Sequence, residues 1–185
     1  DMIVISGHRT YDYQKGLFDR EVAQVGAVEA AYWVASPGGS EHHTGLALDF
    51  SRFDDEGNSN SYTGEGDYAW INSNCYKYGF IVRYATDKVD ITGIKYEPWH
   101  FRYVGQPHAG IIVEKGFCYE EYIDFLKGYK YGEQHLNATG ADGVKYEIYY
   151  VPASTGTATD IPVPKDKSYT ISGNNVDGFI VTAVR

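Results

Sequence analysis

The feature that most constrains the fold of this chain is the alternation of side chains over residues 46–50. The large apolar residues fall on one side of this stretch, and Asp49 falls on the other. Such alternation is typical of a half-buried strand whose apolar face lies in the core, so we predict that Asp49 faces a cleft. Gly45 permits a turn just before the strand, and that turn lets His42 fold back toward Asp49.

A second stretch, residues 97–103, repeats the pattern downstream. Aromatic residues at every second position alternate with His100 and Arg102, which predicts a strand with His100 on its polar side. Glu97 has the wrong parity to share that side in one straight strand. Because Pro98 fixes its own φ and restricts the residue before it, we expect a bend there that brings Glu97 beside His100.

Together the two stretches supply two histidines, one aspartate and one spare glutamate. Zinc hydrolases use this set, with three protein ligands, an open position for water and a carboxylate that takes the water's proton. Either stretch alone is equally compatible with a hydrogen-bonded loop that binds no metal, but their coincidence favours a metal site. We expect His8 and His43 to be neighbours of the site and not ligands.

Both stretches resemble the signature motifs of a known family. Ser40-x-His42-x-x-Gly45-x-Ala47-x-Asp49 and Glu97-x-Trp99-His100 are similar, in full and in order, to those of the VanY-type D-alanyl-D-alanine carboxypeptidases. These zinc peptidases trim peptidoglycan stem peptides and are related to the LdcB-type L,D-carboxypeptidases and the VanX dipeptidases. The similarity runs from Ile3 to at least Tyr129.

The resemblance implies a role for each matching residue. His42, Asp49 and His100 would hold zinc, and Glu97 would be the catalytic base. The stretch at residues 6–10 matches the family's Ser-Gly-x-Arg-Ser/Thr, so Arg9 would meet the substrate. Two roles remain open for this arginine, namely stabilisation of the oxyanion and bidentate binding of the terminal carboxylate.

Two further polar residues are candidate substrate contacts. Ser40 would hydrogen-bond the substrate or, alternatively, hold the loop that delivers His42. Gln14 falls in the first turn of a helix predicted to start at about residue 13, near Arg9. For Gln14, a substrate contact and an ordinary polar position on a helix remain equally open.

Composition excludes several classes of protein. The net charge is −9 and the 16 Lys and Arg form no cluster, which argues against nucleic-acid binding. No run approaches the ~18 apolar residues of a membrane span. Cys75 and Cys118 are expected to be buried free thiols, although a single bridge remains open. The sequence has no Ser-x-x-Lys, Gly-x-Ser-x-Gly or His-Glu-x-x-His motif to support a rival catalytic mechanism.

The order of the predicted elements indicates an α+β fold, with a small, mainly antiparallel sheet flanked by helices and a C-terminal β-rich extension. We expect a zinc carboxypeptidase catalytic domain over residues 1–130 and the extension, packed on it, over residues 131–185. The extension alternatively supplies strands that cover the main sheet. Local predictions are a buried strand at 2–5, a surface loop at 52–67, a helix at 67–78, and extension strands at 144–151, 168–172 and 179–184.

The sequence therefore predicts a zinc-dependent D,D-carboxypeptidase that removes the terminal D-Ala from peptidoglycan stem peptides. The alternatives are an L,D-carboxypeptidase acting on tetrapeptide stems, a D-Ala-D-Ala dipeptidase, and a non-catalytic zinc-bearing module that binds the cell wall. We expect a monomer that acts outside the cytoplasm, in the cell wall or anchored to the membrane through a segment missing from this chain.

Overall fold

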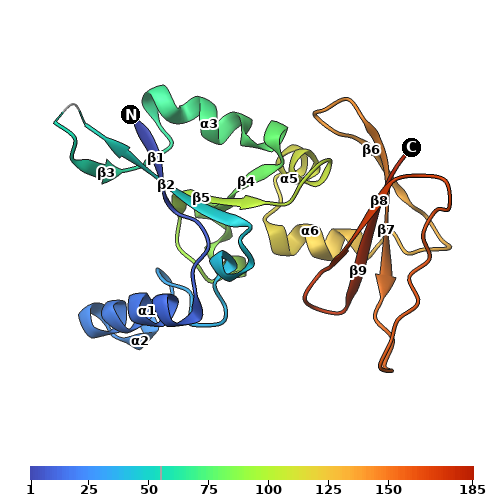
Figure 1. The fold of residues 1–185 in the computed structure, drawn as a ribbon, viewed down its shortest axis with the longest axis horizontal. Coiled ribbons are helices and arrows are strands. Elements are labelled where there is room, and N and C mark those ends of the chain that lie inside the picture. Colours follow the sequence, from blue (N-terminus) through green and yellow to red (C-terminus); the bar gives the residue numbers. More distant parts are fainter. Residues whose placement is uncertain (55) are drawn as a thin grey trace. The chain divides into compact units, whose positions relative to one another are not determined.

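The computed structural model describes residues 1–54 and 56–185 and divides into two compact units, Asp1–Gly105 and Gln106–Arg185. Each unit combines helices with an antiparallel sheet (Figure 1). This confirms the predicted α+β class with a β-rich C-terminal part. Asp55, in the predicted surface loop, lies outside the described residues. Across the described residues, no helix is long and apolar enough to cross a membrane.

The sheet of the first unit has the strand order β1-β2-β5-β4, with β3 paired to β2. The strands are β1 (Met2–Ser6), β2 (Ala47–Phe53), β3 (Ser59–Ser61), β4 (Phe80–Tyr84) and β5 (Glu97–Tyr103). The neighbouring strands β2 and β5 run antiparallel, and Asp49 stands opposite His100. The two motif-bearing stretches, far apart in the sequence, therefore meet on adjacent strands.

Helices cover both faces of this sheet. They are α1 (Tyr11–Val25), α2 (Ala27–Ala30), α3 (Ala69–Asn74) and α4 (Val89–Thr92). In Figure 1, α1 and α2 lie on one side of the sheet and α3 lies on the other. The α1 helix starts at Tyr11, two residues ahead of its predicted start, because the Thr10 hydroxyl accepts a hydrogen bond from the Tyr13 amide at 3.3 Å and caps it.

The apolar core of the first unit lies on the α3 face of the sheet. Its members are Tyr62, Cys75 and Phe101, with Leu48, Phe50, Tyr68, Ile71, Phe80, Val82 and Trp99 packed against them. Since side chains alternate along β2, Asp49 points to the opposite face, as predicted. Leu46 precedes the strand and is 40% exposed, so its assignment to the core face was wrong. Both cysteines are buried and free, as expected.

Three local predictions for the first unit need correction. The strand β1 forms, but it is exposed and not buried, because it is an edge strand that pairs within the described residues only with β2. The predicted loop at 52–67 contains β3 and the buried Tyr62, which is 1% exposed. The helix predicted at 67–78 is broken into two 3₁₀ turns with α3 between them, and it ends at Gly79, where φ is +83°.

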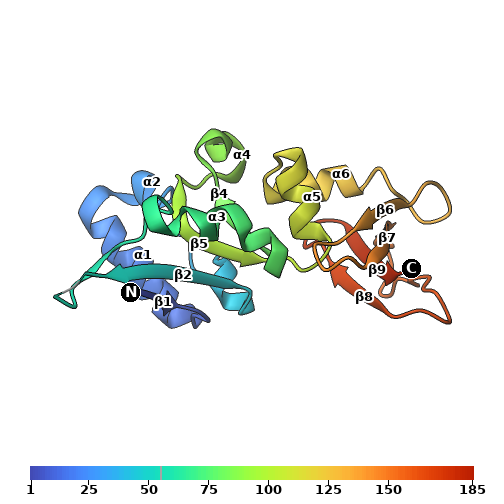
Figure 2. The same cartoon turned by 90° about the horizontal axis from the view of Figure 1, so that it is seen from above.

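The second unit has a four-stranded sheet with the order β6-β7-β9-β8. Its elements are α5 (His108–Lys115), α6 (Tyr119–Leu126), β6 (Leu136–Thr139), β7 (Lys145–Pro152), β8 (Tyr169–Gly173) and β9 (Gly178–Val184). Three of these strands were predicted, and β6 was missed. Figure 2 shows both helices beside the strands.

The helices α5 and α6 belong with the second sheet because hydrogen bonds tie them together. His108 of α5 contacts the Tyr122 hydroxyl of α6 at 2.7 Å and the Thr182 hydroxyl of β9 at 2.8 Å. The compact units therefore divide after Gly105, ahead of the predicted domain boundary after residue 130.

Candidate active site

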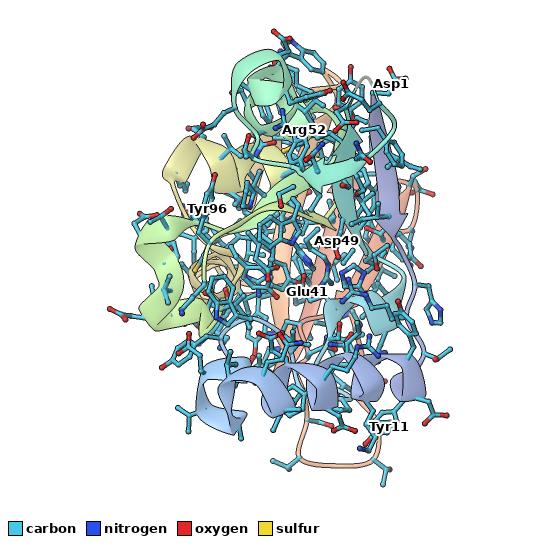
Figure 3. All side chains as sticks on the ribbon, turned by 90° about the vertical axis from the view of Figure 1, so that its left-hand side faces the viewer. Asp1, Tyr11, Glu41, Asp49, Arg52 and Tyr96 are labelled. Atoms are coloured by element: carbon cyan, nitrogen blue, oxygen red, sulfur yellow. The ribbon has the colours of Figure 1, made fainter. Side chains whose placement is uncertain are left out.

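All seven predicted site residues line one pocket of about 300 Å³ in the first unit. They are Arg9, Gln14, Ser40, His42, Asp49, Glu97 and His100. The pocket opens on the sheet face opposite the apolar core, and α1 forms its far wall. Figure 3 shows Asp49 and Glu41 in the middle of this unit, with α1 below them.

A short 3₁₀ helix, Glu41–Thr44, carries His42 into the pocket. The Ser40 hydroxyl caps this turn by accepting from the His42 amide at 3.4 Å. Gly45 ends the turn at φ +72°, a left-handed conformation that favours glycine. Ser40 therefore holds the loop, as one of its two predicted roles requires, while it also lines the pocket.

The bend predicted at Pro98 is confirmed by the pairing of β4 with β5. Val82 pairs with Phe101, but the next pair along the strands joins Tyr84 to Glu97. Between these pairs β5 therefore advances four residues while β4 advances two. The surplus makes a bulge, and bulges redirect side chains. As a result the Glu97 carboxylate reaches to 3.8 Å from His100 Nδ1 despite its odd spacing.

Three side chains converge as potential metal ligands. His42, Asp49 and His100 each offer a ligand atom within 4.8 Å of the others, and all three are buried. His42 Nε2 lies 3.3 Å from Asp49 Oδ2, and His100 Nδ1 lies 3.0 Å from Asp49 Oδ1. The two imidazole rings meet edge to face, with their centroids 5.0 Å apart.

The unsatisfied atoms of this cluster fit a divalent metal. Among the described residues, His42 Nε2 and Asp49 Oδ1 are the buried side-chain atoms without a partner in hydrogen-bond geometry, although His100 Nδ1 lies 3.0 Å from that oxygen. Buried polar atoms normally have partners. The carbonyl of Gly7, 2.6 Å from His42 Nδ1, can only accept, so Nδ1 carries the proton and Nε2 keeps its lone pair. Two imidazoles and one carboxylate form a donor set typical of catalytic zinc.

The carboxylates and imidazoles of the cluster perturb one another's ionisation. Burial raises the pKa of Glu97 to about 7, with a further increase from Asp49 and an opposing decrease from His100. Burial disfavours the charged form of Asp49, but His100 and His42 outweigh it and hold the Asp49 pKa well below its usual range. The His100 pKa is raised to about 9, because Asp49 and Glu41 outweigh the effect of burial.

Arg9 is fixed at the edge of the cluster by three side chains. It donates to Ser6 Oγ at 2.7 Å, to Gln14 Oε1 at 3.3 Å and to Asp49 Oδ2. Gln14 in turn donates to the carbonyl of Ala35 at 2.8 Å and is fully buried. Two of the three residues predicted to contact substrate, Arg9 and Gln14, thus bond to each other, and Arg9 braces Asp49.

One residue of this site, Glu41, was not predicted from the sequence. Its carboxylate lies 3.4 Å from His100 Nε2 and accepts hydrogen bonds from Arg83 and Arg102. Burial opposes ionisation of Glu41, but His100 and the two guanidinium groups lower its pKa to about 2. A signal was present, because Arg102 has the same strand parity as His100 and so falls on the same face of β5.

His43 does not join the cluster, as expected. Its Nδ1 contacts the carbonyl of Arg9 at 2.8 Å, and its Nε2 accepts from the amide of Gly38 at 3.2 Å. Both ring nitrogens are therefore used in holding the loops around the pocket.

Comparison with known proteins agrees with this geometry. A family model described as VanY, D-alanyl-D-alanine carboxypeptidase, matches residues 1–106. The chain belongs to the VanY family. The prediction from the two motifs is thereby confirmed. A D-alanyl-D-alanine carboxypeptidase of Enterococcus faecium is 43% identical to this VanY-family chain over 180 residues, which cover 97% of the chain and 53% of that protein. The chain spans about half the length of the first curated relatives it matches.

Solved structures of family relatives cover the chain to different extents. The D,D-dipeptidase VanXYg, in complex with a D-Ala-D-Ala phosphinate analogue, covers 100% of the chain and 73% of its own length, with a TM-score of 0.88 and 38% identity. A VanY mutant from a VanB-type resistance cassette, in complex with Zn(II), covers 66% of the chain and 71% of its own, with a TM-score of 0.56 and 41% identity. The L,D-carboxypeptidase LdcB covers 67% and 58%, with a TM-score of 0.59 and 45% identity.

Proposed function

We propose that this chain acts as a zinc-dependent D,D-carboxypeptidase that removes the terminal D-Ala from peptidoglycan stem peptides. The observation that carries the proposal is the convergence of His42, Asp49 and His100 in one pocket, with the Glu97 carboxylate 3.8 Å from His100. The solved relatives that hold Zn(II) or D-Ala-D-Ala, at 41% and 42% identity, support the choice of metal and substrate.

His42 through Nε2, His100 through Nδ1 and Asp49 through its carboxylate would hold the zinc. The ion would supply Lewis-acid polarisation of the peptide carbonyl and a lowered pKa for water. Glu97 accepts the proton of the attacking water and passes it to the departing D-Ala amine as the C–N bond breaks. No proton is gained or lost by the protein over the cycle, because Glu97 returns to its starting state.

Arg9 supplies the positive charge that meets the anionic part of the substrate. Its guanidinium lies beside Asp49 at the edge of the cluster, so it can face either the developing oxyanion or the terminal carboxylate. Ser40 and Gln14 line the same pocket and remain candidate substrate contacts. Gln14 is also needed to position Arg9, because it accepts from Arg9 Nη1.

The pocket extends beyond the cluster along α1. Leu17, Arg20, Glu21 and Gln24 line that wall, at spacings that share one face of a helix. A wall of this length, with both charge signs, gives a stem peptide more to contact than a free dipeptide would use. This supports a carboxypeptidase acting at the end of a longer chain.

A dipeptidase activity on free D-Ala-D-Ala is the second candidate. The observation that favours it is the match to VanXYg, a D,D-dipeptidase, across both units of this chain. A relative from Enterococcus gallinarum, 39% identical over 129 residues, is described as a bifunctional D-Ala-D-Ala dipeptidase and D-Ala-D-Ala carboxypeptidase. An L,D-carboxypeptidase is a third candidate, because LdcB is 45% identical over 67% of the chain. The D-alanyl-D-alanine carboxypeptidase of Enterococcus faecium, which matches 97% of the chain, favours the D,D activity over it. A purely binding module would not need the Glu97 carboxylate.

The expected location follows from the substrate. Peptidoglycan stems lie outside the cytoplasm, so we expect the protein to act at the cell wall. We expect it to work as a monomer, since the pocket is lined entirely by residues of the first unit.

The test is direct. The purified chain is loaded with zinc and incubated separately with a stem pentapeptide ending in D-Ala-D-Ala, a stem tetrapeptide and free D-Ala-D-Ala, and the products are weighed by mass spectrometry. Loss of one alanine from the pentapeptide, abolished by a chelator and indifferent to β-lactams, is expected. Cleavage of the tetrapeptide alone would overturn D,D specificity. A zinc-loaded chain that cleaves none of the three would overturn the enzyme proposal.

A further inference from the structure

The carboxylate of Glu41 is held between two arginines and a histidine. Its side chain is 13% exposed. Oε1 accepts from Arg83 Nε at 2.8 Å and from Arg102 Nη1 at 2.9 Å. Oε2 faces His100 Nε2 at 3.4 Å. The two oxygens therefore have separate tasks, one toward the arginines and one toward the imidazole.

Strand parity explains why these groups meet. His100 and Arg102 are two residues apart on β5, so their side chains leave the same face. On the neighbouring strand β4, Ile81 pairs with Arg102, and Arg83 lies two residues further along on that face. Glu41 approaches from the 3₁₀ helix that also carries His42. It thus links the loop of one proposed ligand to the side chain of another.

A carboxylate beside an imidazole decides which ring nitrogen carries the proton. Ionised Glu41 can only accept, so His100 Nε2 must donate to it. Nδ1 of His100, which lies 3.0 Å from Asp49 Oδ1, is then the nitrogen that gives up its proton and offers its lone pair when a metal binds beside Asp49. The same logic operates at His42, where the carbonyl of Gly7 takes the Nδ1 proton. Outer partners of this kind orient metal-ligating histidines and raise their basicity.

We propose that Glu41 is a positioning residue that fixes the tautomer and orientation of His100 so that Nδ1 is presented to the metal, with Arg83 and Arg102 holding Glu41 in place. The inference rests on the proposed metal site. It does not require that the reaction be the one proposed above. The competing explanation is that Glu41 only neutralises two buried arginines.

The variant Glu41→Gln separates these explanations. The amide oxygen of the new side chain will face the guanidinium groups, because an amide N–H there would meet other N–H donors. Its NH₂ group then faces His100 Nε2 and donates to it, which moves the imidazole proton to Nδ1. With the proton on Nδ1, His100 cannot bind a metal through that nitrogen.

The experiment measures zinc affinity by chelator competition, the visible spectrum of the Co²⁺-loaded protein, and the urea midpoint of the metal-free protein. We expect Glu41→Gln to weaken zinc binding about 10–100-fold and to change the Co²⁺ spectrum. The matched control is Glu147→Gln, which removes a carboxylate from the His135 pair of the second unit, 2.8 Å apart. It should change neither zinc affinity nor the spectrum.

Several results would overturn the proposal. One is a folded Glu41→Gln protein with the zinc affinity and Co²⁺ spectrum of the parent, whatever its urea midpoint. If Glu41→Gln does not fold, Glu41→Asp keeps the charge for the arginines but withdraws it from His100. An unchanged zinc affinity in that variant is equally decisive. If the parent protein binds zinc but cleaves no stem peptide, the proposed function fails while the role of Glu41 still stands or falls on these measurements.

Discussion

Two buried histidines in the two units show how surroundings decide what one residue type can do. His100, in the first unit, has carboxylate oxygens near both ring nitrogens, those of Asp49 and Glu41. His108, in the second unit, has only the hydroxyls of Tyr122 and Thr182 as partners. The carboxylates raise the pKa of His100 to about 9, whereas burial lowers the pKa of His108 to about 4.

This difference in partners distinguishes a candidate metal site, around His100, from a structural hydrogen-bonded link, at His108. A cluster with negative charge and unsatisfied lone pairs attracts a cation, and its atoms are poorly satisfied until one binds. A neutral histidine between two hydroxyls has both nitrogens satisfied and needs nothing further. We therefore expect substitutions in the first cluster to affect metal and turnover, and substitutions around His108 to affect stability.

The largest effect is expected for His42→Ala, which removes one of the three proposed ligands. Structural zinc sites bind the ion with a free energy of about 10–16 kcal/mol, which is shared among a few ligands. The loss of one ligand should therefore weaken zinc binding by roughly 10³-fold. Turnover should disappear with the metal, while the fold persists. Zinc analysis after dialysis and far-UV circular dichroism check this. Full zinc occupancy in the variant would remove His42 from the site.

Next in size is the effect of Glu97→Ala on turnover. Because Glu97 is not one of the three proposed ligands, zinc should remain bound. Loss of the proton-transfer group should lower kcat by about 10²–10⁴-fold. Steady-state kinetics on the pentapeptide, with zinc content measured on the same sample, test this. A fully active Glu97→Ala enzyme would refute the base assignment.

Local sequence patterns were sufficient to predict where Asp49 and Glu97 lie in the first unit. Alternation along residues 46–50 places Asp49 on the face opposite the core, and the parity conflict at Pro98 predicted the bulge that brings Glu97 near His100. Both follow from the two-residue period of a strand. The residues expected at the site therefore converge in one pocket, although their roles stay predictions.

What the sequence could not supply were contacts set by the path of the chain. Glu41 meets Arg83, 42 residues away, only because the 3₁₀ helix leads into β2 and lets the Glu41 side chain reach β4 and β5. The exposure of β1 depends on its place at the sheet edge, which its apolar sequence does not reveal. Likewise, nothing near His108 in the sequence indicated that Thr182 would be its partner.

The third prediction tests the structural role of His108. His108→Ala leaves the Tyr122 and Thr182 hydroxyls without their partner and opens a cavity, so it should cost about 4 kcal/mol of unfolding free energy. Zinc affinity should not change. Urea unfolding by circular dichroism measures the first quantity and chelator competition the second. Tryptophan fluorescence reports on the first unit alone, because Trp33, Trp70 and Trp99 all lie in it. A drop in zinc affinity would contradict the separation drawn here.

The smallest effect concerns the dependence of stability on pH. Burial lowers the pKa of His108 to about 4, whereas an unfolded chain has a histidine pKa of about 6.5. Between these values the unfolded state binds a proton that the native state does not, so stability falls as the pH drops through this window. The contribution is about 3 kcal/mol between pH 7 and pH 4.

His108→Gln does not titrate, so its stability relative to the parent should rise as the pH is lowered. Carboxylates such as Glu41 also titrate in acid, but they are common to both proteins and cancel in the difference. Urea midpoints of the two proteins at matched pH values test this, and a constant difference across the window would show that His108 is not the buried neutral group described here.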